Sequence, residues 1–110
     1  MKIKFYSIEK MNEFRTTSVA SGCRIAYDVK VDYATAKHIG FSCSDKKSDT
    51  THSVIYFSER EFPDSWNCDC KWSSLKRSMC KHIFAVFFRL NQDNNFLKKF
   101  EKEKISQAKT

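Results

Sequence analysis

Two short pairs of metal-binding side chains constrain this chain more than any other feature of its sequence. The pairs are Cys68-Asp69-Cys70 and Cys80-Lys81-His82, and nine residues, 71–79, separate them. Structural Zn²⁺ favours four tetrahedral thiolate and imidazole ligands, and two close pairs on separate elements can supply them with little chain strain. The sequence therefore predicts one structural zinc ion, held by Cys68, Cys70, Cys80 and His82.

The spacing within each pair also predicts the backbone around it. Side chains two residues apart point to the same side of an extended segment, but diverge by about 200° around a helix with 3.6 residues per turn. We therefore expect the Trp66–Cys70 segment, which follows a break at 62–64, to be extended. Cys80 should lie before a helix and His82 at its beginning.

Clustered cysteines can also be ordinary core residues or form a disulfide, and both alternatives are disfavoured. Free cysteines are common in cores, but three of them with a histidine within fifteen residues form an unusual cluster. A disulfide between Cys68 and Cys70 conflicts with the tight geometry of disulfides and with a reducing compartment. The odd count of five cysteines agrees with thiols or metal ligands.

Upstream of these pairs, apolar residues alternate with polar ones as in half-buried strands. The alternation from Cys23 to Tyr33 is the clearest, so it predicts a strand there. Ile39, Phe41 and Cys43 predict a second strand and 54–57 a third, paired as a hairpin with a long loop over 44–51.

Several residues in this part of the chain receive individual predictions. Cys23 and Cys43 are interpreted as core residues, whereas His38 and His52 stand alone and are expected on the surface or at strand ends. Residues 7–17 fit a short amphipathic helix, with a strand as the alternative.

Downstream of the second pair, the pattern changes to that of helices. Apolar residues from Ile83 to Leu90 cover most of a helix circumference and leave Ala85 and Arg89 as the expected outer stripe. A basic amphipathic helix follows at about 94–105, and it either stands alone or continues the first one.

Composition limits the class of protein. With 110 residues, 41% hydrophobic and 30% charged, the chain should fold as a single domain over 1–110. The N-terminus lacks a signal-like apolar run, and the longest apolar stretch, 83–88, cannot span a bilayer. We expect an intracellular protein, cytoplasmic or in the nucleoid or nucleus, that is neither secreted nor membrane-bound.

The net charge of +7 lies entirely in the last third of the chain. Residues 1–70 hold ten basic and ten acidic side chains, whereas residues 71–110 hold ten basic and three acidic ones. A basic field of this kind attracts polyanions such as nucleic acid, although it can also be a solvated helix face.

The two pairs resemble the SWIM-type zinc finger. That family has Cys-x-Cys, a variable gap and Cys-x-His running into an apolar helix, and residues 80–87, Cys-Lys-His-Ile-Phe-Ala-Val-Phe, are similar to its second half. The resemblance covers about 54–90 and implies a ββα unit stabilised by zinc. Together with the strands it gives an α+β fold, a small antiparallel sheet packed against a C-terminal helix.

The resemblance also implies a class of partner. Family members occur in transposases, chromatin-associated ATPases, plant transcription regulators and archaeal proteins linked to recombination, and the domain is taken to bind DNA or protein. This chain carries little beyond the finger, so it resembles a stand-alone member.

A closed zinc site points to binding and not to catalysis. Four protein ligands leave no position for water, and the His-x-Glu and Pro-Cys-x-x-Cys motifs of zinc deaminases are absent, so we expect no enzyme and no small-molecule substrate. Nucleic acid, DNA or RNA, is the expected partner. The candidate contacts are Lys71, Lys76, Arg77 and Lys81 to phosphates, with Trp72 stacking on a base.

Two alternatives to nucleic-acid binding stay open. Three thiolates, a neutral imidazole and Zn²⁺ carry a net charge of −1, which the nearby cations can balance. The chain can also be a protein-interaction subunit of a larger nucleoprotein or recombination assembly, docking through the 83–90 helix or the C-terminal helix.

The ligand count gives the first testable prediction. Purified protein should contain one tightly held zinc per chain, because the two pairs complete one tetrahedral site and the sequence offers no second set. Elemental analysis of the purified protein measures this directly. A result of no metal, or of two ions per chain, contradicts the prediction.

Overall fold

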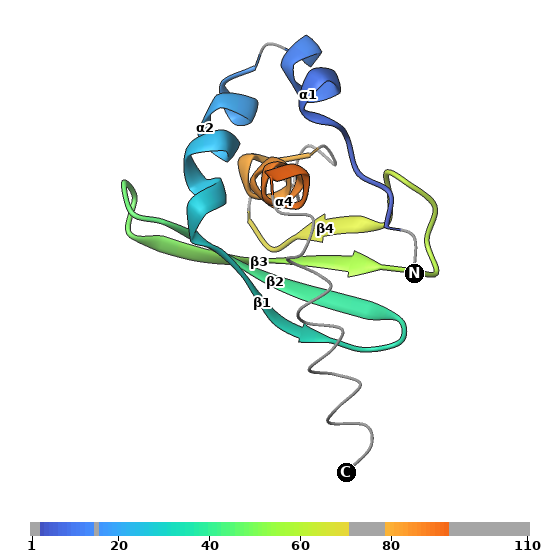
Figure 1. Ribbon diagram of the computed structural model, residues 1–110. Coiled ribbons are helices and arrows are strands. Elements are labelled where there is room, and N and C mark those ends of the chain that lie inside the picture. The colour runs from blue at the N-terminus through green and yellow to red at the C-terminus, as the bar shows by residue number, and fades with distance from the viewer. Residues whose placement is uncertain (1–2, 15, 71–78, 93–110) are drawn as a thin grey trace.

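The fold is a four-stranded antiparallel sheet with helices on one face (Figure 1). A computed structural model describes residues 3–14, 16–70 and 79–92. Their elements, in chain order, are α1 (Ile8–Phe14), α2 (Thr17–Ile25), the 3-10 helix η1 (Ala26–Asp28), β1 (Val29–Ala34), β2 (His38–Asp45), β3 (Thr50–Phe57), β4 (Trp66–Cys68) and α4 (Lys81–Gln92). The expected α+β architecture, an antiparallel sheet packed against a helix that follows the cysteines, is confirmed.

The sheet is built around the β2–β3 hairpin. Its strands pair in register from His38 opposite Phe57 to Asp45 opposite Thr50, with β1 and β4 on the outer edges. The hairpin was expected, but its loop is the short segment 46–49 and not 44–51. The strands extend into that polar stretch because its residues pair across the ladder, as the Ser44 and Thr51 hydroxyls do at 3.2 Å.

The strand expected from Cys23 to Tyr33 is wrong for its first half. Helix α2 runs to Ile25 and η1 follows, so the strand begins only at Val29. Thr16 caps α2 by accepting the Val19 N–H at 3.3 Å. The buried residues Val19, Gly22 and Ile25 follow at three-residue spacing, a helical period that overrides the two-residue alternation.

Helix α4 lies in the middle of the molecule, between the sheet and the other helices (Figure 1). Its residues from His82 to Phe88 are all buried, and so is Leu90. Ala85, expected on an outer stripe, is 0% exposed, so that prediction is wrong. Helix α2 packs over this side of α4 and covers Ala85. Between His82 and Leu90, only Arg89 is partly exposed.

The remaining predictions for the helices divide into two groups. The short amphipathic helix expected over 7–17 is present as α1 at Ile8–Phe14, with Met11 buried. The basic helix expected at about 94–105, and whether it continues the preceding helix, lie outside the described residues.

The crossing of α2 over α4 depends on Gly22. A Cβ added there would lie 2.8 Å from the Phe84 Cβ and 3.0 Å from both the Ala85 N and the Lys81 O. None of these atoms is the far end of a flexible side chain, so the helices would have to separate. The missing side chain is therefore what allows α2 to cover α4 closely.

We predict that Gly22→Ala destabilises the protein by about 1–3 kcal/mol through overpacking. At an uncrowded helix position, replacing glycine by alanine would instead increase the free energy of unfolding by up to about 1 kcal/mol. A decrease at position 22 would therefore show that the two helices are too close for a Cβ. Urea unfolding of the zinc-loaded protein measures it. Cys23→Ala, at the next and exposed position of α2, is the matched control and should stay within about 0.5 kcal/mol of the parent.

Candidate metal centre

The first ligand pair lies on the edge strand β4 and just beyond it. Cys68 ends the strand and pairs with Val54 of β3, which directs it toward the helices. The neighbouring Trp66 fixes the strand, because its ring packs 5.0 Å from that of Phe87 and its Nε1 donates to the Lys4 carbonyl at 2.8 Å. Cys68 and Cys70 are both buried, as their two-residue spacing predicted.

The second pair lies at the beginning of α4. Cys80 precedes the first helical residue, Lys81, and its carbonyl accepts the Phe84 N–H at 3.1 Å. His82 follows in the first turn and is 2% exposed. The expected placement of Cys80 before the helix and His82 at its start is therefore confirmed.

The structure brings the four predicted ligands together. Their ligand atoms all lie within 4.8 Å of one another, and all four residues are buried. The His82 Nδ1 faces the sulfurs, at 3.6 Å from the Cys68 Sγ and 3.7 Å from the Cys80 Sγ. We call Cys68, Cys70, Cys80 and His82 the ligand cluster.

These distances fit a zinc ion. Tetrahedral bonds of about 2.3 Å to sulfur and 2.0–2.1 Å to nitrogen place a sulfur and a nitrogen ligand about 3.6 Å apart. The donor set, three sulfurs and one imidazole, is that of closed structural zinc sites. His82 would bind through Nδ1, and its Nε2, which would then carry the proton, is buried with no hydrogen-bond partner among the described residues.

Hydrogen bonds within the cluster make its thiols differ in acidity, because they stabilise the thiolate of Cys80 and the protonated form of Cys68. Hydrogen bonds from the Cys68 thiol, and then from His82 and the Ile83 N–H, lower the pKa of Cys80 to about 4. The hydrogen bond to Cys80, together with burial, raises the pKa of Cys68 far above its usual value. Adjacent thiolates repel in a buried site, so a divalent cation is what allows all of them to ionise.

The cysteines outside the cluster are not ligands. Cys43 is fully buried, as expected of a core residue, and its Sγ donates to the His82 carbonyl at 3.6 Å. Burial, and then the negative charge of Cys80, raise the pKa of Cys43 to about 12, so it stays a thiol. Cys23, also expected in the core, is exposed on α2, and that prediction is wrong.

His52 lies beside the cluster, which sequence reasoning missed. Its ring centroid is 4.5 Å from that of His82, and its Nδ1 is 2.9 Å from the Asp69 Oδ1. The strand pattern contained the signal: His52 has the same parity as the buried Val54 and Tyr56 of β3, so it faces the helices. His52, at the end of this inward-facing row, therefore points toward the ligand cluster.

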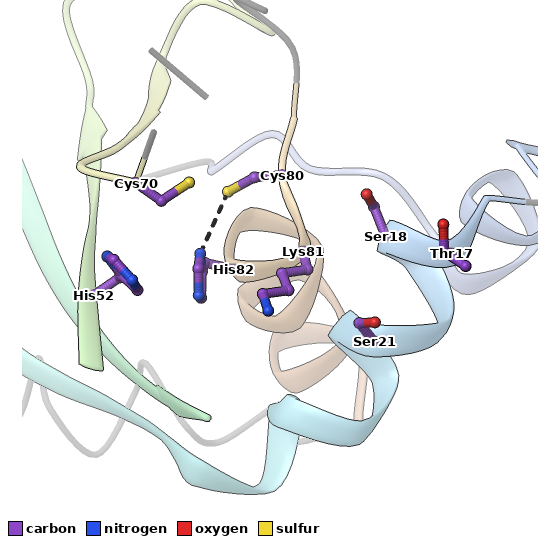
Figure 2. A pocket seen from close by; sticks show the side chains of 8 residues that line it. All are labelled: Thr17, Ser18, Ser21, His52, Cys70, Cys80, Lys81 and His82. Atoms are coloured by element: carbon purple, nitrogen blue, oxygen red, sulfur yellow. Dashed lines mark hydrogen bonds between the residues drawn. The ribbon is translucent and has the colours of Figure 1, made fainter. Parts of the chain in front are cut away.

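A pocket of about 560 Å³ adjoins the cluster (Figure 2). It lies between the beginning of α4 and the first turns of α2, which contribute three hydroxyl side chains. Its lining consists of Thr17, Ser18, Ser21, His52, Cys70, Cys80, Lys81 and His82.

Only one predicted nucleic-acid contact lies within the described residues. That residue, Lys81, donates to the Asp45 Oδ2 at 3.1 Å, and Arg24 binds the same carboxylate at 2.8 and 3.3 Å. The Arg24 hydrogen bond, aided by Lys81, holds the pKa of Asp45 well below its usual range. Lys71, Trp72, Lys76 and Arg77 lie outside the described residues.

Comparison with known proteins agrees with this geometry. Residues 63–91 match the family model of the SWIM zinc finger, so the finger predicted from the sequence is confirmed. The match and the ligand cluster together identify zinc as the cofactor. No curated protein and no solved structure matches the chain.

The match also has clear limits within the chain. It begins at Pro63, so α1, α2 and the first three strands lie outside it.

Among the described helices, none combines the length and the apolar character that crossing a membrane requires.

We predict that folding around α4 depends on the metal. Structural zinc contributes about 10–16 kcal/mol of apparent binding free energy, whereas a domain's net stability is about 5–15 kcal/mol. Cys80→Ser should therefore lose zinc and the cooperative thermal transition, followed by circular dichroism together with metal analysis. The exposed Cys23→Ser is the control and should keep both. A Cys80→Ser protein that melts like the parent contradicts a structural role for zinc.

Proposed function

We propose that this chain is a zinc-dependent binding module that contacts the phosphates of nucleic acid, DNA or RNA, and is not an enzyme. One observation carries the proposal. Cys70 and Cys80, whose sulfurs lie within 4.8 Å of each other, are the two ends of a segment that carries Lys71, Lys76 and Arg77. Coordination of one ion by both ends would keep these cations near the metal centre. Cations held at fixed positions bind phosphates with release of counterions.

The charge distribution supports the same partner. The segment 71–110 holds ten basic and three acidic side chains, whereas the rest of the chain is balanced. The contribution of Lys81 is smaller than its sequence position suggests, because its ammonium already binds Asp45. Residues 71, 76 and 77 are therefore the main candidates for phosphate contacts.

The chemistry of the site supports binding and not catalysis. Four protein ligands complete the zinc coordination, which leaves no position for a substrate or a reactive water. Cys43 and His52, which could be considered as a nucleophile and base, are cross-strand partners in the sheet. However, the Cys43 pKa is raised to about 12 by burial, so its thiolate is scarce at neutral pH.

A protein-interaction module is the competing interpretation. Its first expected docking element, the helix from Ile83 to Leu90, has its apolar side chains buried against the sheet and α2. A protein partner would have to bind elsewhere, for example near the exposed Tyr27 and Tyr33.

We predict that replacing Lys71, Lys76 and Arg77 by alanine weakens binding to DNA and RNA about equally for all sequences. Each lost phosphate contact should also flatten the log–log salt dependence by roughly one unit, so the triple variant should lose about three. Titration of a labelled oligonucleotide at several salt concentrations measures both. The matched control replaces Lys10, Lys37 and Lys46, which are more than half exposed and lie in surface ion pairs.

The outcomes separate the interpretations. The control carries the same change of net charge, so a loss confined to the first variant assigns the contacts to the segment between the ligands. If that variant instead binds nucleic acid normally but holds zinc less tightly, its cations only balance the thiolates. A folded, zinc-loaded triple variant with undiminished affinity and the same salt slope contradicts the nucleic-acid proposal and favours a protein partner.

A further inference from the structure

The residue between the two ligands of each pair makes a charged contact with the β2–β3 hairpin. These residues are Asp69, between Cys68 and Cys70, and Lys81, between Cys80 and His82. Asp69 contacts β3 and Lys81 contacts the last residue of β2. Both contacts reach residues outside the segment that matches the SWIM finger.

Asp69 joins the first ligand pair to β3 by three hydrogen bonds. Its Oδ1 accepts from the Ser53 N–H at 3.2 Å and lies 2.9 Å from the His52 Nδ1, while its own N–H donates to the Ser53 carbonyl at 3.2 Å. These bonds continue the pairing of β3 and β4 one residue beyond the strand, to the point where the chain turns to Cys70. The Asp69 side chain is 58% exposed, so its contact with His52 adds little stability by itself, and its main effect is on geometry.

Lys81 joins the second ligand pair to β2 through a buried carboxylate. The Asp45 side chain is 1% exposed and accepts from Lys81, from Arg24 and from the Lys47 N–H. A buried carboxylate needs such partners, because leaving it uncompensated costs several kcal/mol. The contact therefore fixes the first residue of α4, with Cys80 on one side and His82 on the other.

The two contacts meet at the same hairpin, near its turn. His52 and Asp45 lie on β3 and β2 within three residues of the turn 46–49, and both face the helices. His52 also packs its ring against that of His82, a ligand of the other pair. The hairpin thus touches both halves of the ligand cluster.

We propose that His52 and Asp45 are positioning residues of the zinc site, which hold the two ligand pairs in place for the metal. The rationale is that ordering the ligands costs conformational entropy, and a frame that already orders them leaves more of the coordination energy for affinity. Partners that orient ligands from outside the coordination sphere typically change metal affinity by about 10–100-fold. This inference goes beyond the proposed binding function and does not depend on it.

Two variants test the two contacts separately. His52→Ala removes the donor to Asp69 and the ring beside His82. Lys81→Met removes the link from α4 but leaves Asp45 paired with Arg24, so the carboxylate is not stranded. Each should weaken zinc binding by about 10–100-fold in competition with a chelator at fixed pH. The conservative variants His52→Asn and Lys81→Arg keep a donor at each place and should recover most of the affinity.

A second readout separates positioning from general stability. Co²⁺ bound in place of zinc reports ligand geometry through its visible absorption, so His52→Ala and Lys81→Met should shift or broaden these bands. Two controls accompany them. Glu59→Gln breaks an exposed ion pair with Lys37 and should change neither readout. Val19→Ala destabilises the core at a buried residue that neither belongs to the cluster nor lines its pocket, and it should leave the Co²⁺ spectrum unchanged.

Two results would overturn the proposal. One is zinc affinity within threefold of the parent in both His52→Ala and Lys81→Met. The other is that His52→Ala and Lys81→Met keep the parent's Co²⁺ spectrum and lose no more zinc affinity than Val19→Ala does for the same loss of unfolding free energy. In that second case the two residues support the fold in general and not the position of the ligands.

Discussion

Coordination of one zinc ion by two chain segments is the interaction on which the rest of the structure depends. Strand β4 has only three residues, and such a short edge strand has few ladder hydrogen bonds to hold it. Helix α4 begins directly at the second ligand pair and fills the space between the sheet and α2. The ion joins this short strand to the central helix. The binding free energy of structural zinc, about 10–16 kcal/mol, is as large as the whole stability of a typical domain.

The charges around the ion follow from its burial. Three thiolates and Zn²⁺ carry a net −1, and Asp45 adds a second buried negative charge nearby, which Lys81 and Arg24 compensate. The described cations closest to the cluster therefore already have a structural role. The proposed phosphate contacts are therefore assigned to Lys71, Lys76 and Arg77, which the sequence places between the two ligand pairs.

The ligand cluster was predictable from sequence because coordination chemistry is local: residue type and spacing determine which side chains can converge. The hairpin was predictable for a similar reason, since period-two alternation survives in β2 and β3. The sequence-based predictions were wrong where contacts between elements far apart in the sequence determine the local structure or the burial of a residue. Ile25 fits both a strand and a helix, and packing of α2 on α4 selects the helix. Ala85 is buried because α4 has neighbours on opposite sides. His52 and Asp45 reach the cluster only through the sheet register, which no single segment reveals.

The same observations explain why the matched segment is not a complete structural unit. A ββα finger alone would expose one side of its helix, but α4 has buried residues on every side, and the cover comes from β2, β3 and α2 outside the match. Gly22 permits that cover, since α2 approaches the backbone of α4 at Lys81 and Ala85. Arg24, two residues later on α2, then reaches the carboxylate that binds Lys81. The packing of α2 and the beginning of α4 are thus linked through one buried carboxylate, so the N-terminal half of the chain acts on the zinc site through contacts that the finger motif alone does not contain.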